Sequence, residues 1–483
     1  MKRMSKKTDD LELITYIPKN CPDLNELCNH DMELADSVRI IFHQVYRVKL
    51  KEWSYGDLER KQLEEGGWVS LCSEILSELI DPDKYRPTLD FMIDNGLLDE
   101  KMNGAGFQSY APLKCKKFRI PNKWYRKFER GHMYRKEIVK TKLLVKHVRK
   151  HLESSVTLID YTERTRFQPQ MEQLVQMTKT LCPDKQGILS FCNGQVNDPD
   201  MEWLLLLAED HNEPLDESIF TDEFGQRFFS HVTNLKSDLR KFYRFKKHMD
   251  QPHIMVDFKN SQPFFLGLIL RYPRIVKKFL PEFNTLIPLL EAGSEAEDTV
   301  KFFELVQTGT FYEFMLEKLS GYKMSRKQMK QNLFRSIFYG PVKLSKDAKE
   351  YEMQNAFRTC FESEFPTVYK TIMEIKSVGK ARLPFMDQFY YSRYSGKYLG
   401  DRGSYKNLSN MMQRIEARIV TGAVTNRLVK MRIRPFTTIH DSFWTIASNE
   451  ENVKRQLSIF FARYKVPEPQ FDTTYYHPET VDE

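Results

Sequence analysis

Two aspartates each end a short apolar run, and a carboxylate in such a position is a candidate metal ligand. Asp257 ends the run HIMVD, and Asp441 lies in TTIHDSFWT between Ile439 and Phe443. A carboxylate in apolar surroundings is costly without a partner, and a divalent cation is a partner that also does chemistry. If a sheet brings the two aspartates together, two cations can clamp the attacking and leaving oxygens of a phosphoryl transfer. Taken singly, either aspartate is also explained as a turn or capping residue.

A segment between the two aspartates is predicted to form a helix with cations and rings on one face. In SRKQMKQNLFRSIFYG, four-residue steps separate Arg326, Lys330, Phe334 and Phe338, which places them in one stripe. An arginine and a lysine one turn apart suit a triphosphate, and a ring one turn further on offers a base a stacking surface. An amphipathic helix with a solvated basic edge is the alternative.

Together, these three stretches resemble the core shared by family A DNA polymerases and phage-type single-subunit RNA polymerases. The resemblance covers residues 226–470. It implies an α+β, mostly helical fold with a right-hand polymerase palm and fingers. It also implies that two Mg²⁺ ions, or Mn²⁺ in their place, are held by Asp257, Asp441 and the backbone carbonyl of Phe258.

The same resemblance assigns roles to the residues around the metal site. Arg326 and Lys330 fall on the triphosphate contacts, and with the two aspartates they form the implied catalytic set. Phe334 falls on the residue that stacks on the incoming nucleotide. The implied nucleotide-binding residues are Phe334, Phe338, Tyr339, Gln262 and His440.

The sequence departs from the family pattern at positions that concern the sugar. The Tyr-Gly that ends the helix in the family stands here as Phe338, Tyr339 and Gly340, so either Phe338 replaces the tyrosine or one residue is inserted. Gln262 stands where DNA polymerases carry Glu and RNA polymerases carry Gly, and the last motif reads His-Asp-Ser, as in the RNA polymerases. DNA synthesis is slightly favoured, because Gln262 is bulkier than Gly and a phenylalanine would lack the hydroxyl that reads a ribose.

Positive charge is concentrated in the segment 114–150. It contains 15 Lys and Arg against two Glu, whereas the whole chain has a net charge of +8. Aromatic residues are interleaved with these cations, a composition typical of a surface that follows a phosphate backbone. A solvated helical face is the alternative. The candidate contacts with nucleic acid in this segment are Lys116, Lys117, Arg119, Lys123 and Arg126.

The chain is expected to have three parts. Residues 1–150 are predicted to form a helical, winged-helix-like domain, with a helix over 69–80, a second helix from residue 86 that ends at Asn95-Gly96, a strand-like wing that ends near residue 121, and a basic helical tail over 134–153. Domains of this kind bind DNA, RNA or proteins. Residues 151–225 are placed as a thumb-like or connecting region, and residues 226–483 as the palm and fingers. Candidate primer or template contacts in the third part are Asn234, Arg240 and Gln413.

Composition excludes several classes of protein. A chain of 483 residues with 41% hydrophobic content can bury a large core. The seven cysteines form no CxxC pair, so a disulfide framework or a zinc knuckle is not expected, and a reducing cytoplasm is. We find no apolar run of the length of a membrane span and no signal peptide, which predicts a cytoplasmic protein without a membrane partner.

The sequence as a whole predicts a template-directed polymerase that uses two Mg²⁺ ions to add nucleoside triphosphates to a 3′-hydroxyl of a primer. The expected setting is a phage, a plasmid or another mobile element. An RNA polymerase or a primase-like enzyme of the same fold is one alternative. A non-catalytic DNA-binding replication initiator or regulator is the other, and either could work within a larger complex.

Overall fold

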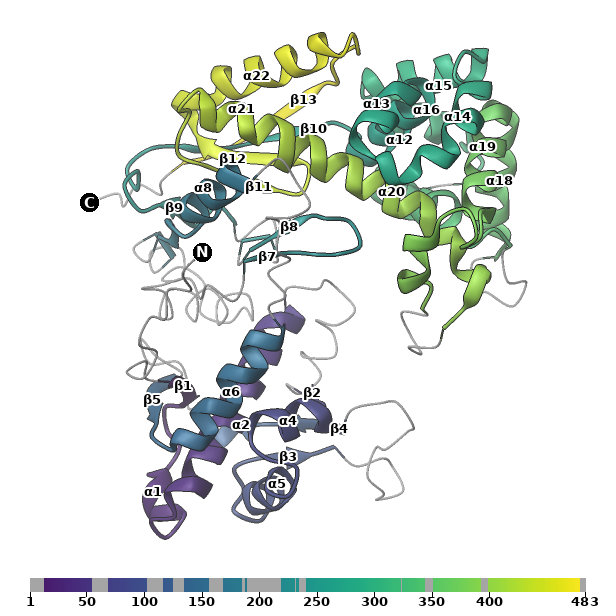
Figure 1. Cartoon of the computed structure of the whole chain (residues 1–483). Helices are drawn as coiled ribbons and strands as arrows, with labels where there is room; N and C mark the ends of the chain where they lie inside the picture. The colour runs from purple at the N-terminus through teal and green to yellow at the C-terminus, as the bar shows by residue number, and fades with distance from the viewer. Residues whose placement is uncertain are drawn as a thin grey trace.

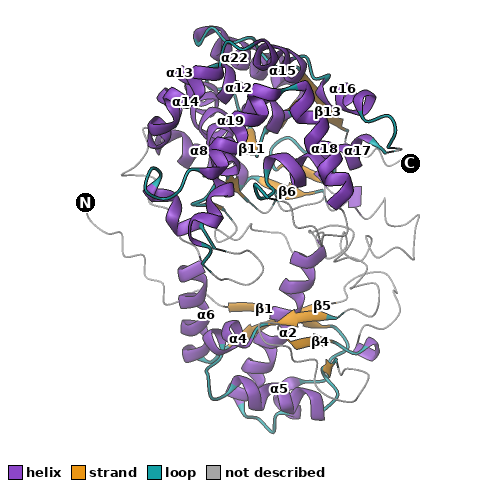
Figure 2. Ribbon diagram, turned by 90° about the vertical axis from the view of Figure 1, so that its right-hand side faces the viewer, coloured by secondary structure: helices purple, strands orange, loops and turns teal. Residues whose placement is uncertain are grey.

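The computed structural model describes residues 13–53, 68–101, 116–124, 134–155, 168–184, 187–188, 219–230, 232–233, 240–322, 324–343, 351–391 and 398–477. Within these ranges the fold is α+β, with many helices and several small antiparallel sheets. Figure 1 and Figure 2 show the N-terminal elements in one group and the elements from α8 (Gln168–Thr178) onward in another. Each group has its own hydrophobic core, and no residue belongs to both cores.

A four-stranded antiparallel sheet organises the second group. Its strands follow one another in the order β11 (Phe436–Ile439), β12 (Ser442–Ile446), β10 (His253–Phe258) and β13 (Phe471–Tyr476). In β10 the side chains of Ile254, Val256 and Phe258 join the hydrophobic core. Because alternate residues of a strand face opposite sides, Asp257 faces away from that core.

Helices pack on the apolar face of this sheet and extend beyond it. α12 (Ser261–Arg271) follows β10 directly and is buried from Gln262 to Leu270. Gly267 lets α15 (Glu297–Gln307) approach, because a Cβ on Gly267 would lie 2.8 Å from the Val306 side chain. The other helices of this group include α13 (Pro273–Phe279), α14 (Ile287–Gly293), α16 (Phe311–Lys318), α18 (Tyr351–Glu364), α19 (Pro366–Ser377) and α22 (Glu450–Arg463). Short 3₁₀ segments connect some of them: η3 (Pro281–Leu286), η5 (Pro384–Phe389), η6 (Gly400–Tyr405) and η8 (Ala447–Asn449).

Two further helices each contain a π-helical segment. α17 (Arg326–Leu333) begins at a capping box formed by Ser325 and Gln328, and it continues without a break into η4 (Phe334–Phe338). A π turn closes with a hydrogen bond between residues five apart, so it accommodates one residue more than an α turn. The second such helix runs through α20 (Lys406–Ala417), η7 (Arg418–Val424) and α21 (Thr425–Lys430).

The N-terminal group contains two helices joined by a turn and followed by two strands, in the order that the sequence predicts for residues 69–121. The prediction placed Val69–Leu71 in the first helix, but these residues form a strand whose Leu71 lies opposite Lys116. Tertiary pairing has outweighed the helical pattern there. The tip of the predicted wing lies outside the described residues. The elements concerned are β2 (Val69–Leu71), α4 (Ser73–Leu79), α5 (Tyr85–Asp94), β3 (Asp99–Glu100) and β4 (Lys116–Arg119).

The predicted helical tail over residues 134–153 begins as a strand. β5 (Tyr134–Val139) pairs with β1 (Leu13–Pro18), and α6 (Lys142–Ser155) starts only after that pairing ends. The prediction missed β5 because its partner strand lies more than a hundred residues earlier in the chain. The remaining elements of this group are α1 (Leu24–Leu27), α2 (Met32–Trp53) and η1 (Asn122–Trp124).

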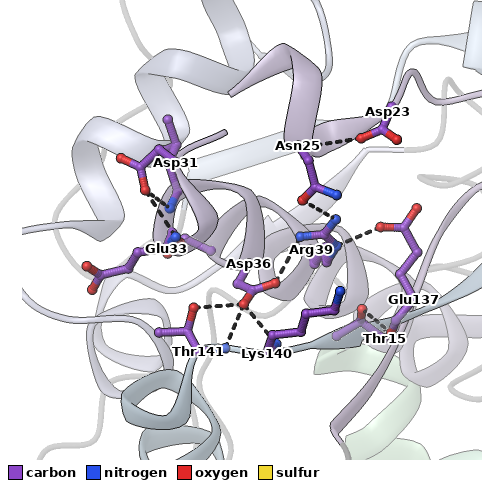
Figure 3. Close-up of polar contacts among 12 residues, drawn as sticks. Thr15, Asp23, Asn25, Asp31, Glu33, Asp36, Arg39, Glu137, Lys140 and Thr141 are labelled. Atoms are coloured by element: carbon purple, nitrogen blue, oxygen red, sulfur yellow. Dashed lines mark hydrogen bonds and ion pairs between the residues drawn. The ribbon is translucent and has the colours of Figure 1, made fainter. Parts of the chain in front are cut away.

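A buried polar cluster ties α2 to β5 and α6. Asp36 is fully buried and accepts hydrogen bonds from the backbone N–H groups of Lys140 at 2.9 Å and Thr141 at 2.8 Å (Figure 3). Arg39 donates to Asp36 at 2.9 Å and to Glu137 at 2.6 Å. Because each charge has both a counter-charge and hydrogen bonds, the cluster holds the three elements together without an unpaired buried ion.

Of the predicted connecting region 151–225, residues 151–155 complete α6, and the described residues from 168 onward pack with the second group. Leu174 and Met177 of α8 belong to the same core as β10 and β12, and Thr178 forms a hydrogen bond with Thr437 of β11 at 2.5 Å. The short strands of this region are β6 (Leu181–Pro183), which pairs with β9 (Tyr243–Phe245), and β7 (Phe220–Thr221), which pairs with β8 (Phe228–Phe229).

The cysteines differ in part from the sequence-based expectation. Cys72 is disulfide-bonded, and its partner lies outside the described residues. The other described cysteines, at positions 21, 28, 182 and 360, are free thiols. The sequence predicts no disulfide framework, and Cys72 is the one described cysteine that is not a free thiol. In the described ranges, no helix combines the length and the hydrophobicity needed to span a bilayer.

Candidate active site

Strands β10 and β12 bring Asp257 and Asp441 to the same end of the central sheet. In the antiparallel pairing Asp257 lies opposite Ser442, the residue that follows Asp441. Neighbouring strands lie about 4.8 Å apart, so the two aspartates are close neighbours across the sheet. His440 and Asp441 form the turn between β11 and β12, and His440 has a left-handed backbone with φ of 53°.

The environment of Asp257 reflects this proximity. Burial and the charge of Asp441 raise the pKa of Asp257 to about 6, while a hydrogen bond with Ser442 and the charge of Arg240 act in the opposite direction. Burial also lowers the pKa of Arg240, whose charge is felt by both carboxylates. Arg240, predicted to contact nucleic acid, thus lies beside the aspartates and offsets part of their repulsion.

The oxygen donors at this end of the sheet fit Mg²⁺. They are the carboxylates of Asp257 and Asp441 and, next in the chain, the backbone carbonyl of Phe258. Mg²⁺ prefers oxygen ligands and is often bound through one or two carboxylates, with water and substrate phosphates completing its octahedron. Within the described ranges, no group of three or more His, Cys, Asp or Glu side chains is arranged to hold a metal ion. Any cation bound here would therefore need oxygens from water or substrate.

A buried polar network lies beside the aspartates and joins three distant segments of the chain. Tyr339 donates a hydrogen bond to Gln262 Oε1 at 2.7 Å, and the amide of Gln262 donates to Glu416. Glu416 forms an ion pair with Arg227, whose Nε lies 2.8 Å from Glu416 Oε1. Burial raises the pKa of Glu416 to about 7, although Arg227 lowers it. Asp441 is near enough to raise this pKa further, which links the network to the end of the sheet that carries the two aspartates.

The π segment η4 determines which aromatic residue faces this network. Phe338 is fully buried in the hydrophobic core, whereas Tyr339 carries its hydroxyl to Gln262. The N–H of Tyr339 donates to the carbonyl of Phe334 at 2.8 Å, which is the five-residue bond of a π turn. A π turn is where a helix takes up one extra residue, which is the geometry that the insertion alternative describes. Phe338 is therefore not available to a nucleotide. A preference for deoxyribonucleotides can no longer be inferred from Phe338 lacking a hydroxyl.

The cations of α17 lie near the turn that follows β10. Arg326 donates to Asn260 Oδ1 at 3.2 Å in that turn and forms an exposed ion pair with Glu313 at 2.8 Å. Lys330 lies with its Nζ 5.9 Å from the ring centre of Phe334 and makes no ion pair with a described carboxylate. Arg326 thus reaches the neighbourhood of Asp257, while the charge of Lys330 is exposed to solvent without a counter-charge.

Tyr312 belongs to this site, although no sequence motif indicated it. It lies on α16, it is 2% exposed, and its hydroxyl has no hydrogen-bond partner among the described residues. The guanidinium of Arg326 lies 5.1 Å from its ring centre. Burial raises the pKa of Tyr312, and Tyr339 and Asp441 are close enough to raise it further. A lone tyrosine on an apolar helix has no spacing that would distinguish it from the core.

His440 and Gln413 also lie close to the aspartates and the network. The ring of His440 meets Phe229 edge-on at 5.2 Å, and burial lowers its pKa to about 4, so the imidazole is neutral at pH 7. Gln413 lies against Gly225, where a Cβ would be 2.5 Å from its Oε1. Gln413 also acts to lower the pKa of Tyr339, which burial raises to about 12.

The predicted nucleic-acid contacts of the N-terminal group are partly neutralised by the strand beside them. Lys116 forms an ion pair with Glu100 at 2.7 Å, and Arg119 forms one with Asp99 at 2.8 Å. The other predicted contacts in the described part are Lys117, in β4, and Lys123, in η1. Two predicted contacts lie outside the described residues, Arg126 and Asn234.

Comparisons with known proteins find distant similarity among solved structures. No protein-family model matches the chain, and no curated protein matches it. Among solved structures, the chain is similar to the POL domain of Pol1 from M. smegmatis, solved in complex with DNA primer-template and dNTP. The TM-score is 0.39 and the identity 10%, over 69% of this chain and 73% of that chain.

Proposed function

We propose that this chain is a metal-dependent nucleotidyltransferase that extends the 3′-hydroxyl of a primer along a nucleic-acid template. One observation carries the proposal: Asp257 and Asp441 lie at the same end of adjacent strands, and Arg326 reaches the turn that follows Asp257. A paired carboxylate site beside a cationic helix matches the needs of phosphoryl transfer, where charge builds up on the transferred group and on the leaving group.

The metal site would consist of Asp257, Asp441 and the carbonyl of Phe258, with two Mg²⁺ ions. When bound, the ions would lower the pKa of the primer hydroxyl and stabilise the pyrophosphate leaving group. Asp257 has to be ionised to bind a cation, so protons compete for this site as the pH falls through about 6. Arg240 would moderate the repulsion between the carboxylates before they are occupied.

The helix α17 would bind the incoming nucleotide. Arg326 can leave its exposed ion pair with Glu313 at little cost, since exposed ion pairs stabilise a protein by about 1 kcal/mol or less. Lys330 already lacks a counter-charge among the described residues. Both cations would then neutralise triphosphate charge, while Phe334, one turn further along, would stack on the base.

Deoxyribonucleotides are the substrates that the polar network favours. Gln262 is 7% exposed and is held between Tyr339 and Glu416 at the start of α12, in the turn that would lie beneath the sugar. The hydroxyl of Tyr339 is already bonded to Gln262. A 2′-hydroxyl in this place would meet a fixed side chain and find its polar atoms engaged, which disfavours ribose.

The test is primer extension with Mg²⁺ on DNA and RNA templates, with dNTPs and NTPs compared side by side. Asp257→Ala and Asp441→Ala should each lower incorporation by at least a thousandfold and leave the affinity for primer-template nearly unchanged. Asp250→Ala, in an exposed turn before β10, is the matched control and should retain full activity. Full incorporation by either aspartate variant would remove the assignment, and tight binding without turnover by the unaltered protein would favour a non-catalytic initiator instead.

A further inference from the structure

A cavity of about 350 Å³ lies among the end of α21, the residues that lead into β11, and one side of α22. Its apolar wall includes Met431 and Ile459, which are 60% and 36% exposed. No described acidic residue lines it. Four arginines do: Arg427, Arg432, Arg434 and Arg455.

Two of these arginines are fixed by neutral partners. Arg427 donates through Nε and Nη2 to Gln456 Oε1, at 3.2 and 3.0 Å, and Gln456 is 4% exposed. Arg434 donates to the side-chain carbonyl of Gln173. An amide orients a guanidinium but does not neutralise it, so both positive charges remain uncompensated at the cavity.

The other two arginines have no partner within the described ranges. Neither the guanidinium of Arg432 nor that of Arg455 makes a hydrogen bond or an ion pair with a described residue. Arg432 also has φ of 55°, a left-handed conformation that residues with a side chain rarely adopt. The backbone beside it is held in place, because Asn449 Nδ2 donates to the carbonyl of Arg434 at 3.0 Å. Four cations therefore face one cavity on a fixed scaffold, without a counter-charge.

The cavity is separate from the aspartates. The residues 432–434 precede the first residue of β11, whereas Asp441 follows its last residue. A four-residue strand is about 13 Å long, so the two sites lie at opposite ends of one strand.

We propose that this cavity is a second anion site, which binds a small compound carrying two or more linked phosphate groups. Guanidinium forks match phosphate oxygens in geometry and charge, and four of them suit more than one phosphate. The volume lies within the range of small-molecule sites. The ligand class is pyrophosphate or a nucleoside di- or triphosphate, and in the second case Met431 and Ile459 give the base an apolar surface.

The test is isothermal titration of the full chain with pyrophosphate, orthophosphate, ATP and AMP, in the presence of EDTA. Pyrophosphate should bind at one site with a Kd in the micromolar range, and orthophosphate at least tenfold more weakly. Tighter binding of ATP than of pyrophosphate would identify a nucleotide as the ligand, and equal binding would identify the pyrophosphate group alone. The absence of pyrophosphate and ATP binding would overturn the proposal.

Variants distinguish this cavity from the proposed active site. The double substitution Arg432→Asn with Arg455→Gln should weaken pyrophosphate binding at least tenfold, since asparagine tolerates the left-handed backbone. Arg463→Gln, on an exposed position of the same helix α22, is the matched control and should bind normally. Lys330→Ala should leave binding in EDTA unchanged. Loss of pyrophosphate binding in Lys330→Ala but not in the double variant would place the anion at α17 and overturn the proposal. Binding of a DNA oligonucleotide through these arginines without binding of pyrophosphate would also overturn it.

Discussion

Asp257 titrates in an environment that opposes its charge. Its pKa is raised from 3.8 to about 6, so the folded protein holds this proton more tightly than the unfolded chain does. The free energy of unfolding therefore falls as the pH rises from 3.8 to 6, and it stays lowered at higher pH. Asp257→Asn removes the titration. We expect this variant to be more stable than the unaltered protein by about 3 kcal/mol at pH 8, and by about half of that at pH 5.

Denaturation by urea in metal-free buffer at both pH values measures this difference. Mg²⁺ should raise the stability of the unaltered protein at pH 8 and leave that of Asp257→Asn unchanged. Asp250→Asn, in the exposed turn before β10, should show neither effect. A variant that is destabilised equally at pH 5 and pH 8 would contradict the idea that burial and the charge of Asp441 oppose ionisation of Asp257.

Gln262 is the residue at which the choice of sugar can be tested. Removing its side chain opens the space beneath the proposed sugar site and leaves Tyr339 without its acceptor. We expect Gln262→Ala to increase the use of NTPs relative to dNTPs by about 10- to 100-fold, equivalent to about 1.4–2.7 kcal/mol. Gln388→Ala, at an exposed position, is the control. Steady-state kinetics with both substrates provides the ratio, and an unchanged ratio would mean that another residue selects the sugar.

For single residues, residue type and spacing predict part of the candidate site. Asp257, Asp441 and Arg326 carry unusual charges at strand ends or at helical spacing, so their sequence pattern is visible, and the structure brings them together. Tyr312 has no such pattern, because an apolar helix uses tyrosine as freely as phenylalanine. Arg240 lies beside the aspartates through tertiary structure, since the strand that follows it, β9, pairs with β6 and not with the central sheet, and no local pattern encodes that pairing.

The η4 segment positions the aromatic residues on the side of the site proposed to bind the nucleotide. Its π turn shifts every later residue by one position, which buries Phe338 and turns Tyr339 toward Gln262. A sequence pattern with a four-residue step cannot distinguish a replaced residue from an inserted one, because both leave the same letters in order. Only the hydrogen bond from Tyr339 to Phe334 decides between them.

Two buried cations hold the end of this element. Arg358 of α18 donates to the carbonyl of Ser336 at 2.9 Å and to those of Pro341 and Val342. Lys376 of α19 donates to the carbonyl of Gly340 at 2.8 Å. A Cβ on Gly340 would lie 1.9 Å from a backbone oxygen, so only glycine fits there. The turn after η4 therefore depends on side chains that come from two later helices.

We expect Arg358→Ala to lower the free energy of unfolding by about 2–4 kcal/mol, because it leaves three carbonyls without their donor. Nucleotide incorporation should fall more than tenfold at temperatures where the variant is still folded, since Tyr339 loses its fixed position. Thr359→Ala, on the exposed side of the same helix, should change neither property. Thermal unfolding and primer extension on the same samples separate the two effects. Normal activity in a folded Arg358→Ala would show that the π turn is held by other contacts.

The helical periodicity of the sequence gives a wrong prediction for two strands, and for the same reason in both. Val69–Leu71 and Tyr134–Val139 were predicted as helix and are strands, and each pairs with a segment far away in the chain. Helices such as α5 and α17 are built from hydrogen bonds within one segment, so their periodicity is sufficient to predict them. The central sheet was anticipated because its two aspartates required it, and its outer strand β13 was not.

At the scale of the whole molecule, charge and hydrophobic packing divide the chain in the same way. The two hydrophobic cores share no residue, and the cation-rich segment 114–150 belongs to the N-terminal group. Part of that positive charge is neutralised within the group, since Lys116 and Arg119 form ion pairs with acidic residues of β3. The remaining cations are those able to release counterions from a phosphate backbone.

Removal of residues 1–155 tests whether the N-terminal group contributes to nucleic-acid binding while the second group carries the proposed activity. Because the second core is complete without them, the shortened chain should fold and should still incorporate nucleotides when primer-template is saturating. Its affinity for primer-template should fall at least tenfold, and the slope of log affinity against log salt should become shallower by roughly 3, as expected if about three phosphate contacts are lost. Fluorescence anisotropy over 50–200 mM salt measures both quantities. An unchanged slope in a folded, active shortened chain would mean that the second group alone contacts the backbone, and that the positive charge of residues 114–150 serves a partner other than nucleic acid.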